Sequence, residues 1–283
     1  MNWPRAPFYW REGDTEYASV PFTWTLPDVQ DHINQRRFDS PRRYVVGGPA
    51  VRLMPNYLTG CEIGGDMPGV LQRVNPQATR TTLGCPNRCQ FCAIGKGRIE
   101  GEWSVLEDWP DNPILCDNNL LAAPTEHIER VVDRLVVHGW ADFNQGLDCR
   151  LMTPELATLL REIPKPIIRL SLDSAGLEPI WTGAVDMLRS AGIQKAAIQS
   201  YVLVGFNTGP EESWARCSYA EKRVGRINPQ WYHSLDCMEA NTVTDDQRTL
   251  GWTDKERARL MGWFYRRRGE PLKGSAKEGS HEN

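Results

Sequence analysis

Short apolar runs alternate with segments of helical periodicity through most of the chain. Runs typical of strands begin near Pro113, Ala141, Ile167, Ala196 and Gln230, and one more, Thr79 to Leu83, precedes them. The segments between them repeat apolar residues every three or four positions, as helices with one buried face do. This alternation predicts parallel strands joined by crossover helices. We therefore expect an α/β fold with six strands.

The ends of the helices carry the clearest local signals. The pattern after Pro124 ends at Gly139, and glycine favours helix ends. Five apolar residues before it fall on one face of the predicted helix: Ile128, Val131, Val132, Leu135 and Val136. Thr153-Pro154-Glu155 starts a second helix, with Pro at a tolerated position. Further helices are expected over 180–191 and through 214–224. The capping-box pattern from Thr253 to Glu256 begins a last one.

The first 75 residues have a different pattern and predict a small α/β extension. A short polar segment, 28–38, precedes the run from Tyr44 to Pro49, which reads as a buried strand ending in a glycine turn. We divide the chain into this extension (1–75), a strand–helix unit (76–235), a helical segment (236–268) and a polar tail (269–283). The composition of the tail predicts disorder.

Composition narrows the class of protein. The chain has 283 residues, is 40% hydrophobic and has a net charge of −3. No apolar run reaches the eighteen residues of a membrane span. Eight cysteines without a signal-peptide pattern predict a reducing, cytoplasmic location. The pI near 6.0 predicts no general attraction to nucleic acids.

Three cysteines, Cys85, Cys89 and Cys92, fall within eight residues directly after the strand-like run at 79–83. A zinc site would use four protein ligands, or three with a His or carboxylate and one open position. A 4Fe-4S cluster also normally has four thiolates, so three would leave one iron open. Zinc, three inert thiols and an incompletely ligated cluster are therefore the alternatives.

The spacing CxxxCxxC, with the aromatic Phe91 before the last cysteine, resembles the signature of the radical S-adenosylmethionine enzymes. The resemblance implies a partial (βα)6 TIM-like barrel, a 4Fe-4S cluster on the three cysteines, and S-adenosylmethionine chelated to the free iron. In that family the reduced cluster cleaves the sulfonium to methionine and a 5′-deoxyadenosyl radical, which abstracts hydrogen from the substrate. An electron donor such as flavodoxin or ferredoxin, and sensitivity to oxygen, are implied too.

The extension also resembles part of that superfamily. The string VVGGP at 45–49, followed by Asn56-Tyr57-Leu58, is similar to the end of the cobalamin-binding domain of one branch. The chain departs from it in lacking Asp-x-His-x-x-Gly and in length. Cobalamin is therefore doubtful, and a scaffold or a wall on the substrate side is the favoured interpretation.

Polar residues follow the predicted strands, where sites in such barrels lie. Asp117, Asn118 and Asn119 resemble the stretch that binds the methionine amino group in the family, although an Asx turn is the alternative. The third strand region, from Asp142 to Arg150, is unusually polar. It makes Gln145, with Asn144, Asp148 and Arg150, a candidate for cofactor or substrate contact.

The fourth strand alternates, so that Arg169, Ser171 and Asp173 share one face. The resemblance implies contacts to the ribose and carboxylate of S-adenosylmethionine, and an Arg169–Asp173 ion pair is the alternative. On the fifth strand, Gln199 and Tyr201 share a face and are candidates for the adenosyl pocket, with core positions as the alternative.

The remaining candidates lie further along the chain or among the other cysteines. Gly205 begins a stretch that resembles the family's adenine-binding turn. Catalytic candidates are Cys116, Cys149, Tyr201 and His233, with core positions as the alternative.

These observations predict a radical S-adenosylmethionine enzyme that abstracts hydrogen from an unidentified small-molecule or nucleotide substrate. Two alternatives remain: a radical enzyme that modifies a nucleotide or nucleic-acid base, and a non-enzymatic metal-binding module that holds zinc. The other five cysteines have no cluster spacing, which argues against a second cluster and against the methylthiotransferase branch.

Overall fold

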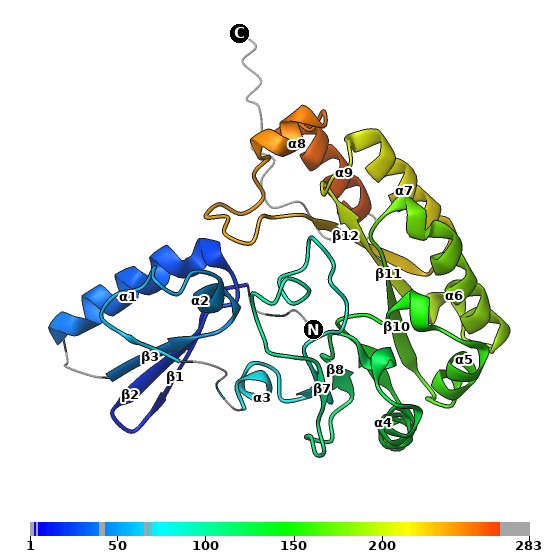
Figure 1. Ribbon diagram of the computed structural model, residues 1–283, viewed down its shortest axis with the longest axis horizontal. Coiled ribbons are helices and arrows are strands. Elements are labelled where there is room, and N and C mark those ends of the chain that lie inside the picture. The colour runs from blue at the N-terminus through cyan, green and yellow to red at the C-terminus, as the bar shows by residue number, and fades with distance from the viewer. Residues whose placement is uncertain (1–2, 4, 40–42, 65–66, 68, 267–283) are drawn as a thin grey trace, which may run out of the picture.

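The N-terminal part of the computed structural model is a small sheet with helices, as Figure 1 shows in blue. The structure describes residues 3, 5–39, 43–64, 67 and 69–266. The strands are β1 (Phe8–Glu12), β2 (Thr15–Ser19), β3 (Arg43–Gly47) and β4 (Glu62–Ile63), in that order across the sheet. β1 and β2 form an antiparallel hairpin, and the other neighbours are parallel. The helices here are η1 (Thr23–Thr25), α1 (Leu26–Asp39), α2 (Pro49–Leu53) and α3 (Val70–Val74).

The predicted buried strand and glycine turn in this extension are confirmed by β3 and Gly48. Gly48 has φ +100°, and a Cβ there would lie 2.8 Å from the backbone N and O of Val20. The polar segment at 28–38 is part of α1, which the sequence did not identify as a helix. Leu26, Val29 and Ile33 form its buried stripe, and they pack on the sheet in a separate small core.

The larger part contains a six-stranded sheet in which every neighbouring pair is parallel. The strands are β5 (Ala78–Thr79), β8 (Ile114–Leu115), β9 (Ala141–Phe143), β10 (Pro166–Leu172), β11 (Ile198–Val204) and β12 (Arg226–Trp231), with the order β12-β11-β10-β9-β8-β5. This confirms the prediction of an α/β fold with a parallel sheet. The strand order follows the chain order, which is the simplest outcome of repeated crossover connections.

Helices α4 (Thr125–His138), α5 (Pro154–Arg161), α6 (Glu178–Ser190) and α7 (Pro210–Arg223) connect the strands from β8 to β12 and follow one another along the same side of the sheet (Figure 1). α4 ends at Gly139, with φ +75°, as predicted. The Thr153 side chain accepts a hydrogen bond from Leu156 N and caps α5. The chain continues through α8 (Asp245–Thr249) and α9 (Asp254–Arg266), where Glu256 N donates to Thr253 Oγ1. Short 3-10 turns lie at 120–122, 149–151, 175–177 and 195–197.

Two predicted strands differ from the structure. The run at 79–83 is divided between β5 and β6 (Thr82–Leu83), and β6 pairs antiparallel with β7 (Ser104–Val105). The last strand, predicted to start near Gln230, instead runs from Arg226 to Trp231 and contains Pro229, a residue that the prediction placed outside it. Proline lacks a backbone donor and is tolerated in an edge strand, and β12 is at the edge of the sheet.

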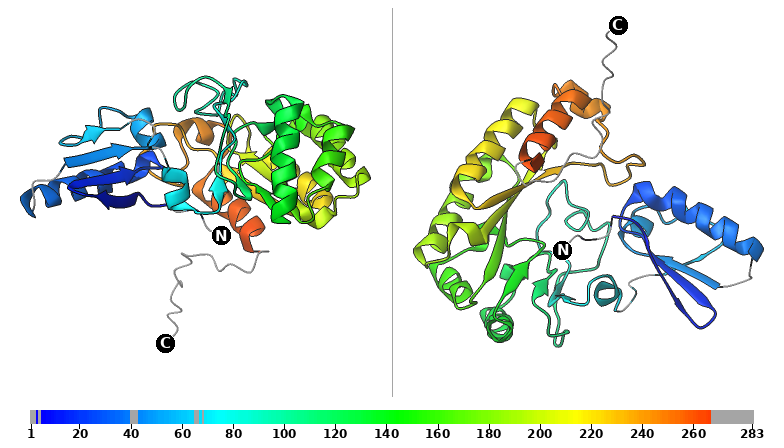
Figure 2. Two further views of the ribbon diagram at one scale, coloured as in Figure 1. Left: turned by 90° about the horizontal axis from the view of Figure 1, so that it is seen from below. Right: turned by 180° about the vertical axis from the view of Figure 1, so that it is seen from behind.

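The two parts meet beside the C-terminal end of β12, where Thr23 Oγ1 donates to the carbonyl of Cys237 and the Trp24 ring lies 4.9 Å from that of His233. Figure 2 shows the N-terminal sheet beside the larger part in both views. Among the described residues, no helix has the length and apolar character needed to cross a membrane. The predicted disordered tail, 269–283, lies outside the described residues.

Candidate active site

A cavity of about 800 Å³ lies where the cysteine loop faces the ends of four neighbouring strands. Its walls come from the loop after β6 and from the segments that follow β8, β9, β10 and β11. Because these strands are parallel, their carboxyl ends share one edge of the sheet, which is where sites in α/β folds are found. The predicted residues that line the cavity are Cys85, Cys89, Phe91, Cys92, Asn118, Asn119, Gln145, Asp148, Cys149, Arg150, Ser171 and Asp173.

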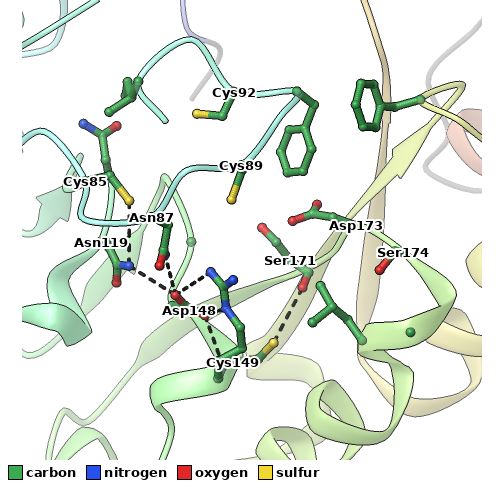
Figure 3. Close-up of a pocket in the computed structure, with 18 of the residues that line it drawn as sticks. Cys85, Asn87, Cys89, Cys92, Asn119, Asp148, Cys149, Ser171, Asp173 and Ser174 are labelled. Carbon is green, nitrogen blue, oxygen red and sulfur yellow. Dashed lines mark hydrogen bonds and ion pairs between the residues drawn. The ribbon is translucent and has the colours of Figure 1, made fainter. Parts of the chain in front are cut away.

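The cysteine loop is a series of tight backbone turns. Cys92 N donates to the carbonyl of Cys89 over 3.1 Å, and Lys96 N donates to that of Cys92. A Cβ on Gly95 would lie 2.7 Å from Cys89 N, so only glycine fits. In Figure 3 the three sulfur atoms lie on one side of the cavity, and Cys85 and Cys89 project toward Asp148. The loop thus presents three thiols to one space.

The three thiols are not drawn together as the ligands of a closed zinc site are. A tetrahedral zinc site, with Zn–S near 2.3 Å, needs sulfur atoms about 3.8 Å apart. In the part of the chain that the structure describes, no three His, Cys, Asp or Glu side chains lie close enough to hold a single metal ion. None of the eight cysteines, all of which the structure describes, forms a disulfide. A polynuclear cluster, in which each thiolate binds a different iron, tolerates wider spacing, and soft thiolates are its preferred ligands.

Asp117 does not line the cavity; it is buried and holds the start of the cysteine loop through hydrogen bonds. Its Oδ1 accepts hydrogen bonds from the backbone N and the Oγ1 of both Thr81 and Thr82, over 2.5 to 3.1 Å. Burial raises the pKa of Asp117, while these four donors lower it. This carboxylate ties the start of the cysteine loop to the end of β8. The two residues after it are the ones that reach the cavity.

Asn118 is held by Glu100, a residue that the sequence analysis missed. Asn118 Nδ2 donates to Glu100 Oε2 over 2.8 Å, and the same oxygen accepts from Gly84 N over 2.9 Å. Glu100 Oε1 pairs with Arg80. Glu100 has φ +60°, in the left-handed region that non-glycine residues seldom adopt. No sequence spacing marks it, because its partners lie in two other segments of the chain, 80–84 and Asn118.

Asp148 and Arg150 connect the third strand region to the cysteine loop. Arg150 Nε lies 2.7 Å from Asp148 Oδ1, and its second guanidinium nitrogen lies 2.8 Å from Oδ2. Asn87, another residue that the prediction missed, donates to Asp148 Oδ2 over 2.8 Å. Burial acts to raise the pKa of Asp148, but the hydrogen bonds from Arg150 and Asn87 prevail and the pKa lies below its usual range. Asp148 is therefore a charged anchor at the cavity wall.

The alternation predicted for β10 is confirmed, but its polar residues separate into two groups. Ser171 and Asp173 line the cavity and in Figure 3 project from the wall opposite the cysteines. Arg169 is directed elsewhere: its guanidinium makes two hydrogen bonds with Asp142, over 2.7 and 2.5 Å. The alternative of an Arg169–Asp173 pair is therefore wrong, because the ion-pair partner of Arg169 is Asp142.

Asp173 carries the most perturbed carboxyl group of the cavity wall. Burial raises its pKa to about 6, opposed by the more distant charges of Arg216 and Arg150. Burial of a carboxylate without a close cation is costly and disfavours the charged form. A cationic ligand in the cavity would supply the positive charge that the Asp173 carboxylate lacks nearby.

The predicted residues of β11 lie away from the cavity. Gln199 Oε1 accepts from Asn228, and the Tyr201 hydroxyl donates to the carbonyl of Asn144 over 2.6 Å. Gly205, with φ +82°, allows Trp231 to pack against the strand end, because a Cβ there would lie 2.7 Å from the indole. Its neighbour Phe206 lines the cavity instead.

Of the catalytic candidates, one lines the cavity. Cys149 does so, and burial raises its pKa to about 11. Cys116 is buried in a small core, where its pKa is raised to about 12. His233 Nε2 accepts a hydrogen bond from Asn241 N over 2.8 Å, outside the cavity.

Two aromatic rings meet across the mouth of the site. Phe91, from the cysteine loop, and Phe206, from the end of β11, make an edge-to-face contact with ring centroids 5.6 Å apart. This contact joins the loop to the far wall of the cavity. Aromatic pairs in this arrangement are favourable beyond the area they bury.

Comparison with solved structures identifies the fold. Two structures of TsrM, a radical S-adenosylmethionine methyltransferase from Kitasatospora setae, align with TM-scores of 0.56 over 78% of this chain. One contains cobalamin and a 4Fe-4S cluster, and this chain is 11% identical to it and covers 64% of it. The other contains tryptophan and an analogue of S-adenosylmethionine, at 13% identity and 62% coverage. The chain thus spans less than two thirds of TsrM. No family model and no curated protein sequence matches it. The chain has the fold of a radical S-adenosylmethionine enzyme.

Proposed function

We propose that this protein is a radical S-adenosylmethionine enzyme, with a 4Fe-4S cluster held by Cys85, Cys89 and Cys92. The observation that carries the proposal is that these three thiols line one cavity at the carboxyl ends of the parallel strands. The shared fold supports it. The six-stranded sheet with its row of helices would then be the partial (βα)6 barrel of that superfamily.

The donor set fits the cluster, because three soft thiolates leave one iron open to a small chelating ligand. When bound, the cluster and S-adenosylmethionine together supply reductive cleavage of a carbon–sulfur bond, and thus radical chemistry on a carbon–hydrogen bond. The protein supplies binding, orientation and exclusion of water.

The cavity residues suit S-adenosylmethionine in distinct ways. Asp173 offers a buried negative charge to the cationic ligand. The amide of Asn118 and the hydroxyl of Ser171 provide hydrogen-bonding groups on two different walls. Phe91 and Phe206 provide apolar surface beside them. Gln145 lines the same cavity and remains a proposed contact.

Cobalamin is not part of the proposal. The cavity within the N-terminal sheet, lined by Tyr9, Glu16 and His32 among others, has a volume of about 10 Å³, far below that of a corrinoid. His32 is paired with Glu16. We propose instead that this part is a scaffold beside the site. A cytoplasmic location, and a flavodoxin or ferredoxin as electron donor, complete the proposal.

Anaerobic reconstitution with iron and sulfide tests it. The wild type should bind close to four irons per chain, absorb as a brown iron–sulfur protein, and release 5′-deoxyadenosine from S-adenosylmethionine after reduction. Replacement of the three loop cysteines by alanine should abolish all three properties. Cys61→Ala is the matched control, because Cys61 is a partly exposed cysteine outside the cavity. Stoichiometric zinc without sulfide would refute the proposal.

A further inference from the structure

Two of the three loop cysteines have a nitrogen-bearing side chain of the cavity wall beside them: Cys85 has Asn119, and Cys89 has Arg150. Asn119 Nδ2 lies 3.8 Å from Cys85 Sγ, within the range of a hydrogen bond to sulfur. Burial raises the pKa of the Cys89 thiol, and the positive charge of nearby Arg150 acts in the opposite direction. Asn119 and Arg150 both line the cavity. These sulfurs stand in for the thiolates that would ligate iron.

One carboxylate holds both donors in place. Asp148 Oδ2 accepts from Asn119 Nδ2 over 3.1 Å, and Asp148 makes two hydrogen bonds to the guanidinium of Arg150. Asn119 is only 2% exposed. Figure 3 shows the dashed contacts from Asp148 to Asn87 and Asn119, and from Asn119 on to Cys85. The positions of the donors are therefore fixed before any ligand binds.

Such donors act differently on the two oxidation states of a cluster. One-electron reduction adds negative charge that is shared by the cluster and its thiolate sulfurs. N–H donors, and a cation at a sulfur, stabilise the more negative state more strongly, which raises the reduction potential. Outer-shell partners of metal ligands commonly tune the metal in this way. Because Asp148 offsets the charge of Arg150, the hydrogen bond from Asn119 to Cys85 is the larger of the two contributions in the wild type.

We propose that Asn119 and Arg150, oriented by Asp148, are positioning residues that raise the reduction potential of the cluster through the sulfurs of Cys85 and Cys89. This inference rests on the proposed function, since it requires the cluster. It assigns to the polar segments after β8 and β9 a role that is separate from binding S-adenosylmethionine.

The test is a redox titration of the reconstituted holoenzyme, followed by electron paramagnetic resonance, with iron and sulfide measured for every variant. Asn119→Leu removes one donor. At a fixed solution potential it should lower the ratio of reduced to oxidised cluster roughly threefold to tenfold, where tenfold is 59 mV for one electron. Arg150→Met should lower the ratio further, because it also leaves the charge of Asp148 uncompensated. Arg150→Lys should recover part of the shift.

Asn118→Leu is the matched control. Asn118 is the same residue type, lies next in the chain and lines the same cavity, but its amide donates to Glu100 instead of to a cysteine. In titrations without S-adenosylmethionine, which Asn118 is proposed to contact, the midpoint potential of this variant should stay at the wild-type value.

The outcomes separate this inference from the proposed function. Full cluster content with a lowered potential in Asn119→Leu and Arg150→Met supports it. Full content with an unchanged potential in both variants overturns it and leaves the proposed function intact. Reduced content with an unchanged potential of the remaining cluster also overturns it, because the residues would then be structural. A wild type that takes up no cluster refutes the proposed function and this inference together.

Discussion

Asp173→Asn tests whether the cavity wall is destabilised by its own carboxylate. The substitution keeps the size of the side chain and removes the charge. In the ligand-free protein we expect it to increase the free energy of unfolding near neutral pH, since burial raises the pKa of Asp173 to about 6 from the usual 3.8. The same substitution should weaken binding of S-adenosylmethionine. Such opposition between stability and function is typical of binding sites.

The magnitude and its sign follow from proton linkage. Between pH 3.8 and 6 the folded state holds the proton of Asp173 while the unfolded chain has lost it, so stability falls as pH rises through this window. The full difference corresponds to about 3 kcal/mol, because one pKa unit is worth 1.36 kcal/mol. Between pH 5 and pH 8 the accessible part is about 1.4 kcal/mol.

The assay is urea unfolding of the ligand-free, reduced protein at pH 5, 6, 7 and 8. The stability difference between Asp173→Asn and the wild type should grow in favour of the variant by about 1.4 kcal/mol across this range. Asp186→Asn is the control, because it makes the same change in net charge at an exposed position on α6. A difference that is independent of pH, or one that favours the wild type increasingly at high pH, would refute the reasoning.

Three further substitutions test the architecture around the site. Asp117→Leu removes the acceptor of four buried donors in the threonine pair before the cysteine loop, of which the Thr81 hydroxyl alone keeps a second partner, His127; it should cost about 3 kcal/mol or more in urea unfolding. Gly205→Ala places a Cβ 2.7 Å from Trp231 at φ +82°, and should lower stability by about 2 kcal/mol or more, seen as a lower thermal midpoint; an unchanged midpoint would contradict the contact. Gly95→Ala pushes on the backbone of Cys89, and should reduce iron bound per chain while the thermal midpoint of the ligand-free protein changes little.

Local signals in the sequence determined several features correctly. The spacing of Cys85, Cys89 and Cys92 places three thiols in one loop whatever the rest of the chain does. Helix α4 follows from one apolar face and the glycine after it, because both act within a few turns of chain. The alternation along β10 separated Ser171 and Asp173 from the core face, since neighbouring side chains of a strand point to opposite sides.

Tertiary structure alone decided how the polar residues at the strand ends are used. Strands β5 and β8 have two residues each, too few to show a period. In the run after β8, sequence could not show that Asp117 turns toward two threonines while its neighbours reach the cavity. Nor could it show that Arg169 pairs with Asp142, because alternation assigns a face but does not choose a partner. Those choices depend on side chains that the packing of separate strands brings together.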